Sequence, residues 1–322
     1  MASISLKSAL VATLAAVATA MPAAPRLSDR QLKIHQAIKR QEAAAGAAGI
    51  TDPDILQFAL TLEWLETTFY QQGLQQVPQQ QFLDLGLTQE QVADLALQAK
   101  QEETHVQLLQ GALAQKGVQP VQPCQYNFGQ AFSSASAMLQ TAVTLEQVGV
   151  SAYLGAAPLI QDKSILGTAA SIYSIEARHQ TFTRVATKVS ASPSSFDTPL
   201  SPKQVFTLAA PFIASCPQGS NLQLTAFPNI TMSNPEVTAQ IAAASPQMLQ
   251  LQSTGATGAA ACAFSSGDLP TGTMFTQFAN GACPTPQGLK GVVYVNLVNS
   301  MPEDSKISDD IIAAGPMVLV LS

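Results

Sequence analysis

The chain has 322 residues, carries a formal net charge of −6, and is 47% hydrophobic but only 11% charged. This length exceeds the roughly 250 to 300 residues that one hydrophobic core usually fills, so a large domain with a smaller second one is expected. The high apolar fraction excludes disorder over most of the chain, and beyond the N-terminus no apolar run reaches the about 18 residues of a membrane span.

The N-terminus has the pattern of a secretory signal peptide over residues 1–20. A single charge precedes an apolar run from Ala9 to Val17, and Ala18-Thr19-Ala20 supplies a small-x-small cleavage site. Residues 21–40 are basic and end in the dibasic pair Lys39-Arg40. We interpret them as a pro-segment, with an ordinary linker as the alternative. The sequence therefore predicts a secreted, extracellular protein.

Removal of residues 1–40 would make the chain strongly acidic. Six of the 15 basic residues and one of the 21 acidic residues would be lost, leaving a net charge of −11. Nucleic-acid binding depends on Lys and Arg side chains that neutralise phosphates. An acidic surface therefore excludes nucleic acid as a partner.

The four cysteines are expected to form two disulfides, because a secreted protein meets an oxidising environment. None of them lies in a CxxC pair, so a zinc site is not expected. Of the three possible pairings we predict Cys124 with Cys216 and Cys262 with Cys283, since each bridge then stays within one predicted domain. Asn229-Ile230-Thr231 is a candidate glycosylation site in a loop-like stretch.

Apolar residues at helical spacing predict a bundle in the first half of the mature chain. A first helix starts at Thr51-Asp52-Pro53-Asp54 and runs to about Gln72. A Gln-rich loop follows. A second helix begins with a capping-box pattern at Thr88–Gln91 and continues to Lys116, where Gly117 ends it. Three more helices are expected: Gln130 to Ala157, one capped by Asp162 that ends before Pro193, and a shorter one from Ser201 to Cys216.

The character of the chain changes from about Pro217. Turn residues become frequent, and short apolar runs at 247–251, 291–295 and 317–321 are typical of strands. The sequence thus predicts a mainly α protein: a four-helix bundle plus a fifth helix at 50–216, a linker at 217–235, and a small β-rich C-terminal domain at 236–322. The last part carries no recognisable catalytic motif.

The residues that could bind a ligand or take part in a reaction lie in an internal repeat. Helix one contains Leu62-Glu63 and helix three Leu145-Glu146, each followed seven residues later by a tyrosine, Tyr70 and Tyr153. Helices two and four each contain Glu-x-x-His, as Glu102 with His105 and Glu176 with His179. The chain has only 3 histidines, and the remaining one, His35, lies in the predicted pro-segment.

The spacing predicts a metal site. Residues three apart share one face of a helix, so each Glu-x-x-His pair can point at the same spot. One Glu from each of two helices, with Glu-x-x-His from each of the other two, is the ligand set of ferritin-like di-iron and di-manganese proteins. Four carboxylates would balance two divalent cations in an apolar core. We therefore predict two ions, iron or manganese, held by Glu63, Glu102, His105, Glu146, Glu176 and His179.

Four further residues near this set have other expected roles. Tyr70 and Tyr153 share the inward face but lie about 10 Å along the helix axis from their own glutamates. We expect them to pack in the core and hydrogen-bond a buried carboxylate, with a redox role as the alternative. Glu66 and Glu103 break the repeat, so we interpret them as solvated or as hydrogen-bonding to ligands.

At these residues the chain resembles secreted fungal ferritin-like proteins of the stress-response type, akin to plant desiccation-related proteins. The resemblance covers roughly residues 50–215. It rests on these strings: Leu62-Glu63 with Tyr70, Glu102 with His105, 123–128, 147–156, 175–179 and 196–201. It implies a ferritin-like bundle with a dinuclear metal site, and it brings no settled reaction.

Three functions are compatible with this pattern. The first is a redox enzyme that reduces peroxide or dioxygen at the dinuclear centre in a stress response. The second is metal binding without turnover, and the third is a structural protein of the extracellular matrix or cell wall. An intact ligand set argues against the third. Iron and manganese both suit carboxylate-rich sites with two imidazoles, so the sequence leaves the metal open, as it does the oligomeric state.

Overall fold

A computed structural model describes residues 49–220, 222, 224–238, 241 and 246–321. The predicted signal peptide, the predicted pro-segment and His35 lie outside this range. Among the described residues, no helix is both long enough and apolar enough to cross a membrane.

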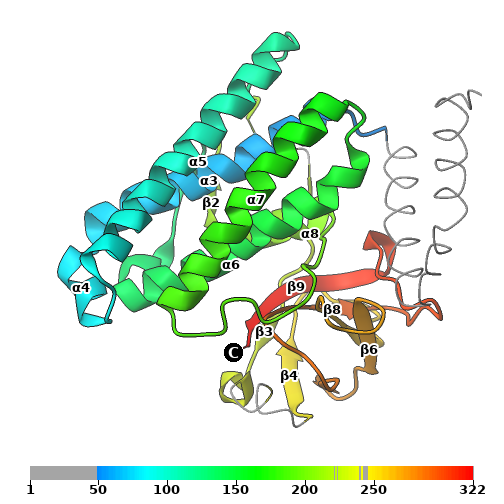
Figure 1. The fold of residues 1–322 in the computed structure, drawn as a ribbon. Helices are drawn as coiled ribbons and strands as arrows, with labels where there is room; N and C mark the ends of the chain where they lie inside the picture. Colours follow the sequence, from blue (N-terminus) through cyan, green and yellow to red (C-terminus); the bar gives the residue numbers. More distant parts are fainter. Residues whose placement is uncertain (1–48, 221, 223, 239–240, 242–245, 322) are drawn as a thin grey trace, which may run out of the picture.

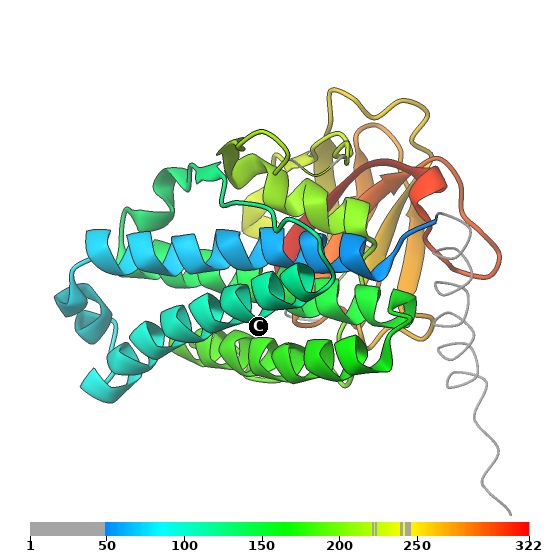
Figure 2. The same ribbon diagram turned by 90° about the horizontal axis from the view of Figure 1, so that it is seen from above.

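Four long helices form the bundle (Figure 1): α3 (Asp52–Gln76), α5 (Gln89–Gln115), α6 (Ala135–Ala156) and α7 (Lys163–Ala186). The helix α3 packs mainly against α5, and α6 packs mainly against α7. Seen from above, these helices run lengthwise beside one another (Figure 2). The described residues also form two short helices, α4 (Gln79–Asp84) and α8 (Pro202–Ala209).

The predicted starts of the first, second and fourth helices are confirmed by their caps. The Thr51 side chain accepts from the Asp54 amide and the Thr88 side chain from the Gln91 amide, each within a capping box. The Asp162 carboxylate accepts from the Ser164 amide at the start of α7. These side chains satisfy amide groups that a helix leaves unpaired in its first turn.

Several predicted helix boundaries are wrong. The third helix begins at Ala135 rather than Gln130, because Ser134 caps it and Gly129–Phe132 form a separate 3-10 turn. The fourth does end before Pro193 as predicted, at Ala186, behind which Lys188 has a positive φ of 62°. The fifth ends at Ala209. Pro211 follows there and has no amide hydrogen to continue the ladder.

Two more corrections concern the connections between helices. The first helix extends to Gln76, and the predicted Gln-rich loop behind it contains α4. After α8 the chain forms β2 (Ile213–Ser215), which pairs antiparallel with β1 (Gln125–Tyr126). This small ribbon joins the connection before α6 to the end of the helical region.

The remaining strands form two antiparallel sheets on the side of α6 and α8 (Figure 1). A four-stranded sheet has the order β6-β5-β8-β9 and a three-stranded sheet the order β3-β4-β7. The three predicted strands are confirmed as β4, β8 and β9. The strands are β3 (Thr231–Met232), β4 (Met248–Gln252), β5 (Ala261–Ser265), β6 (Thr273–Gln277), β7 (Ala282–Pro284), β8 (Val292–Val298) and β9 (Ile312–Val320).

Strand β8 is buried on both faces, and this joins the sheet to the bundle. Val293 and Val295 pack between the two sheets, whereas Val292 and Tyr294 belong to the core of the bundle. The Tyr294 hydroxyl bonds the Ser151 hydroxyl of α6 at 2.7 Å and donates to the Gln147 carbonyl at 3.3 Å. Helices and strands therefore share a core, and the residue boundaries of the domains stay a prediction.

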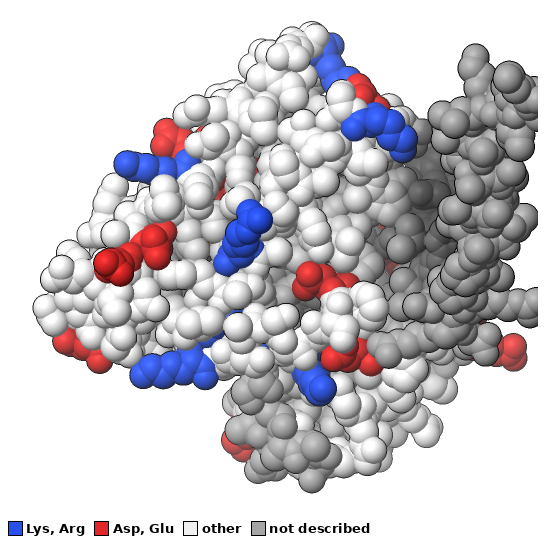
Figure 3. All heavy atoms as spheres, in the orientation of Figure 1, with Lys and Arg blue, Asp and Glu red and all other residues white. Residues whose placement is uncertain are grey.

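Charged side chains are sparse on the surface. On the face that Figure 3 shows, the described charged residues are scattered, some beside a residue of opposite sign, and neither sign forms a large patch. Asn229 is exposed in the loop before β3, where a glycan could be attached. Glycosylation at this residue stays a prediction.

Both predicted disulfides, Cys124–Cys216 and Cys262–Cys283, are confirmed in the structure. They close loops with sequence separations of 92 and 21 residues. The first ties the segment before β1 to the end of β2, and the second joins β5 to β7 across the two sheets.

Removing the longer disulfide should cost more stability than removing the shorter one. On the chain-entropy account, replacing Cys124 and Cys216 by serine should lower the free energy of unfolding by about 4 to 5 kcal/mol, and the Cys262/Cys283 pair by about 3 kcal/mol. Chemical denaturation of both double variants measures the difference. The reverse order would show that native strain outweighs loop entropy here.

Candidate metal centre

The four long helices bring all six predicted ligands to one place in the core. Helix α3 contributes Glu63 and α6 contributes Glu146, while α5 and α7 contribute the two Glu-x-x-His pairs. Every one of these side chains is buried, and the four glutamates are 0% exposed. A cluster of this composition within an apolar core requires compensation for its charge.

The donor atoms form two overlapping groups. One group contains Glu63, Glu102, His105 and Glu176, and the other contains Glu102, Glu146, Glu176 and His179. Within each group the donor atoms lie within 4.8 Å of one another. Glu102 and Glu176, the glutamates of the two Glu-x-x-His pairs, belong to both groups. The arrangement therefore offers two adjacent positions for a metal ion.

The two imidazoles face the carboxylates through their Nδ1 atoms. His105 Nδ1 lies 3.1 Å from Glu102 and 3.2 Å from both Glu63 and Glu176. His179 Nδ1 lies 2.6 Å from Glu102 and 3.6 Å from Glu146. The contact from His179 to Glu102 is short but lacks hydrogen-bond geometry. Each imidazole thus has one nitrogen directed at several carboxylate oxygens.

Buried donor atoms without a hydrogen-bond partner show that the cluster suits metal ions. These atoms are Glu102 Oε1, Glu146 Oε2, both carboxylate oxygens of Glu176 and His179 Nδ1. Gly149 of α6 leaves space beside them, because a Cβ there would lie 2.9 Å from Glu66 Oε1 and 3.1 Å from Glu176 Oε2. Buried polar atoms normally have partners, so these unpaired oxygens and nitrogen are suited to coordinating cations.

The pKa values show how the cluster is charged without metal. Burial opposes charge on both imidazoles, but hydrogen bonds and attraction to the carboxylates outweigh it, raising the pKa of His105 to about 12 and of His179 to about 11. For the Glu63 carboxyl, burial also favours the uncharged form and raises its pKa to about 7. Glu102 differs, since its close contacts with both histidines outweigh its burial and lower its pKa to about 2. Protons therefore occupy the cluster in place of cations.

Metal uptake is expected to release protons. An imidazole must lose its proton to coordinate a metal, and both histidines carry one at neutral pH in the metal-free protein. The histidines release one proton per ion and the raised carboxyl pKa values add to this, so the apparent affinity should fall at least about tenfold for each pH unit of acidification. Calorimetric titration in buffers of different ionisation enthalpy measures the protons released, and a binding heat that is independent of the buffer would contradict the expectation.

The two tyrosines bond across the bundle. Tyr153 of α6 donates to Glu63 Oε1 of α3 at 2.5 Å, and Tyr70 of α3 donates to Glu146 Oε1 of α6. The predicted hydrogen bond to a buried carboxylate is confirmed for both. Each tyrosine reaches the glutamate of the opposite helix, because α3 and α6 carry the same seven-residue spacing. These bonds fix the orientation of two predicted ligands.

Glu66 and Glu103 differ from each other. Glu103 is exposed, as a solvated carboxylate would be. Glu66 is only 4% exposed, so the solvated interpretation is wrong for this residue. Burial raises its pKa well above the usual range, and the neighbouring carboxylates raise it further, with Glu176 foremost. Glu66 lies three residues after Glu63, so the spacing argument applied to the Glu-x-x-His pairs could have found it.

Gln101 is a neighbour that sequence reasoning missed. Its side-chain oxygen accepts from His179 Nε2 at 2.7 Å, joining α5 to α7. A proton fixed on Nε2 leaves Nδ1 free to face the carboxylates. No local pattern signals this role, because the partner lies 78 residues away on another helix.

The fold and this cluster define a class. Residues 51–188 match the family model described as a ferritin-like domain, and this part of the chain forms such a domain. Over 187 residues the chain is 25% identical to Protein rds1 of Schizosaccharomyces pombe (strain 972 / ATCC 24843), a match that covers 58% of this chain. It covers 45% of that protein, so the chain spans less than half the length of this curated relative.

Proposed function

We propose that this protein is a secreted ferritin-like protein that holds two iron or manganese ions and reduces peroxide or dioxygen in a stress response. The two overlapping donor groups that share Glu102 and Glu176 carry the proposal. Glu63 and His105 would complete one metal position, and Glu146 and His179 the other. Their composition is that of ferritin-like dinuclear centres.

When bound, two redox-active ions would supply the electrons for reducing a small oxidant. The chain's own residues would do the rest. Tyr70 and Tyr153 orient two of the carboxylates, and Gln101 holds the His179 ring. The four glutamates are 0% exposed, so the fold keeps bulk solvent away from them. A dry site with fixed donors strengthens every electrostatic interaction within it.

Extracellular location is part of the proposal. Two disulfides suit an oxidising compartment. The predicted signal peptide would deliver the chain there, and a protective role would follow from consuming oxidants outside the cell.

Metal analysis followed by oxidant consumption tests the proposal. Protein purified from its own host is expected to contain about two iron or manganese ions per chain. Added hydrogen peroxide should then be consumed, since its disproportionation needs no outside reductant, whereas dioxygen reduction requires an added electron donor. Fully loaded protein that is inert towards both oxidants would favour metal sequestration without turnover. Zinc alone at one ion per chain would contradict the dinuclear assignment.

A further inference from the structure

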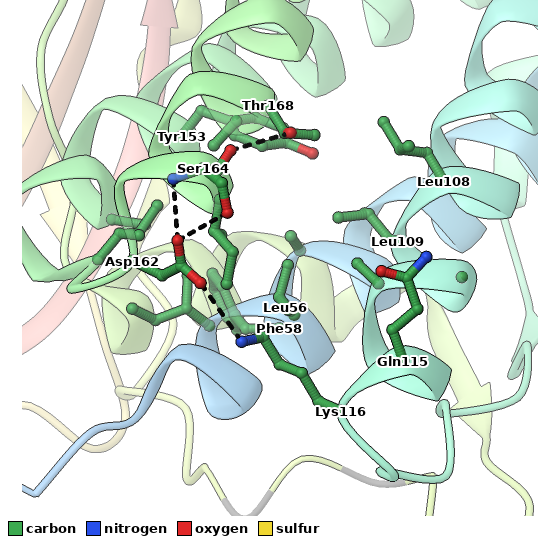
Figure 4. Close-up of a pocket in the computed structure, with 18 of the residues that line it drawn as sticks. Leu56, Phe58, Leu108, Leu109, Gln115, Lys116, Tyr153, Asp162, Ser164 and Thr168 are labelled. Carbon is green, nitrogen blue, oxygen red and sulfur yellow. Dashed lines mark hydrogen bonds and ion pairs between the residues drawn. The ribbon is translucent and has the colours of Figure 1, made fainter.

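A pocket of about 530 Å³ opens between the four long helices beside the proposed metal centre. Figure 4 shows residues of α5, such as Leu108 and Leu109, on one side and residues of α6 and α7, such as Tyr153 and Thr168, on the other. Its volume lies within the roughly 300 to 1,000 Å³ of small-molecule sites. The pocket opens between α5 and α7. These two helices lie apart because α5 packs mainly on α3 and α7 packs mainly on α6.

The walls of this pocket are largely aliphatic. Leu56, Leu62, Leu109 and Ile165 line it from three helices, and alanines on all four long helices leave the space between them. Leu108 stands at its edge with 45% of its surface exposed. A hydrocarbon chain laid along such walls would remove apolar surface from water, which is favourable in proportion to the area covered.

The inner end of the pocket touches the proposed metal centre. Tyr153 lines the pocket, and its hydroxyl donates to Glu63 Oε1 at 2.5 Å. Leu62, the neighbour of Glu63 in the chain, also lines it. Among the described residues that form the pocket there is none of the six proposed ligands. A bound molecule would therefore reach the partner of a ligand without displacing any ligand.

The outer end of the pocket is polar, but its charges are already matched. Lys116 Nζ lies 3.6 Å from Asp162 Oδ2, and the other oxygen of Asp162 accepts from the amide and hydroxyl of Ser164 (Figure 4). Asp52 lies alongside, since its carboxylate accepts from the Asp162 amide at 2.9 Å. This second acidic group disfavours an anionic head group, and both of its oxygens already accept from the Gln161 and Asp162 amides, so they are not free for a cationic one. The exposed amide of Gln115 can hydrogen-bond an uncharged one.

We propose that this pocket binds a neutral aliphatic amphiphile, with its hydrocarbon chain directed at Tyr153 and an uncharged hydroxyl head beside Gln115 and the Lys116–Asp162 pair. The aliphatic walls recognise the chain, and the matched charges at the mouth select against a charged head. This binding does not depend on metal or on turnover, because the pocket is formed by the helices alone.

Displacement of a neutral fluorescent dye tests the proposal. Nile red is titrated into the full mature chain, and dodecanol, dodecanoate and dodecyltrimethylammonium are then added as competitors with the same chain length. Dodecanol should displace the dye at about tenfold lower concentration than either charged competitor. Stronger displacement by the anion or the cation, or no displacement by dodecanol, would overturn the proposal.

Two glycine substitutions locate the site. Gly111 lines the pocket on α5, and a Cβ there would meet nothing within 4 Å, so Gly111→Phe is designed to direct a ring into the pocket. Gly167 on α7 has the same open surroundings outside the pocket, which makes Gly167→Phe the matched control. Both replace a helical glycine, so both variants should fold. Gly111→Phe should weaken dodecanol binding at least about tenfold while Gly167→Phe stays within about twofold.

Equal effects of the two substitutions would overturn the proposal. So would a wild-type dimer that Gly111→Phe converts to a monomer in light scattering, because a second copy would then cover the pocket. Metal content is measured in the same samples. Dodecanol binding by a chain that holds no metal would leave the pocket proposal standing while the proposed function fails, and the two outcomes are thus separable.

Discussion

Replacing both Glu102 and Glu176 by glutamine is expected to reduce bound metal from about two ions per chain to nearly none. Glu102 and Glu176 are the two residues that belong to both donor groups. The double substitution therefore removes two carboxylates from each of the two metal positions. Glutamine keeps the size of the side chain but cannot balance a cation. Mass-spectrometric elemental analysis after dialysis measures the loss.

A neighbouring glutamate provides the matched control for this experiment. Glu103 follows Glu102 directly on α5 but is exposed, so Glu103→Gln should leave the metal content unchanged. The double variant should melt below metal-free wild type, because Glu102 is the ionised partner of both protonated histidines, so circular dichroism is used to show that it is folded. Unchanged metal in a folded double variant would show that the cluster is not the binding site.

The cluster could be predicted because its information is local. A Glu-x-x-His pair needs only the helix period to bring both side chains to one face, and the repeat of the pattern supplied the second half of the cluster. The helix starts were equally accessible, since Thr51, Thr88 and Asp162 are caps whose partners lie two or three residues away. Whether the six residues bind metal stays a prediction that the geometry supports.

The features missed from the sequence depend on distant parts of the chain. The fifth helix was expected to reach Cys216, but it ends at Ala209, and the following β2 pairs with β1, some 90 residues earlier. Strand β5 is buried along its whole length, so it lacks the alternation that marks a half-exposed strand. Gln101 acquires its role from His179 on another helix. Such contacts are set by packing rather than by local pattern.

Substitution of Glu63 or Glu146 by alanine should lower the rate of peroxide consumption about a hundredfold or more, if the proposed function holds. Each removes one donor from a single metal position and leaves both shared glutamates in place. The melting temperature should change little, because the burial of each carboxylate raises its pKa and makes its charge costly in the metal-free protein. Equal losses of rate and stability would indicate unfolding instead.

The tyrosines that hold these glutamates should give a smaller but distinct effect. Tyr70→Phe and Tyr153→Phe each remove only the hydroxyl that donates to Glu146 or Glu63. Loss of such an orienting bond typically costs about ten- to a hundredfold in metal affinity or activity. Tyr173→Phe is the control, because its hydroxyl contacts Asp197 at 3.4 Å rather than a glutamate of the cluster. A rate unchanged in all three variants would mean that the tyrosines serve packing alone, whereas losses confined to Tyr70 and Tyr153 would tie the cross-bundle bonds to turnover.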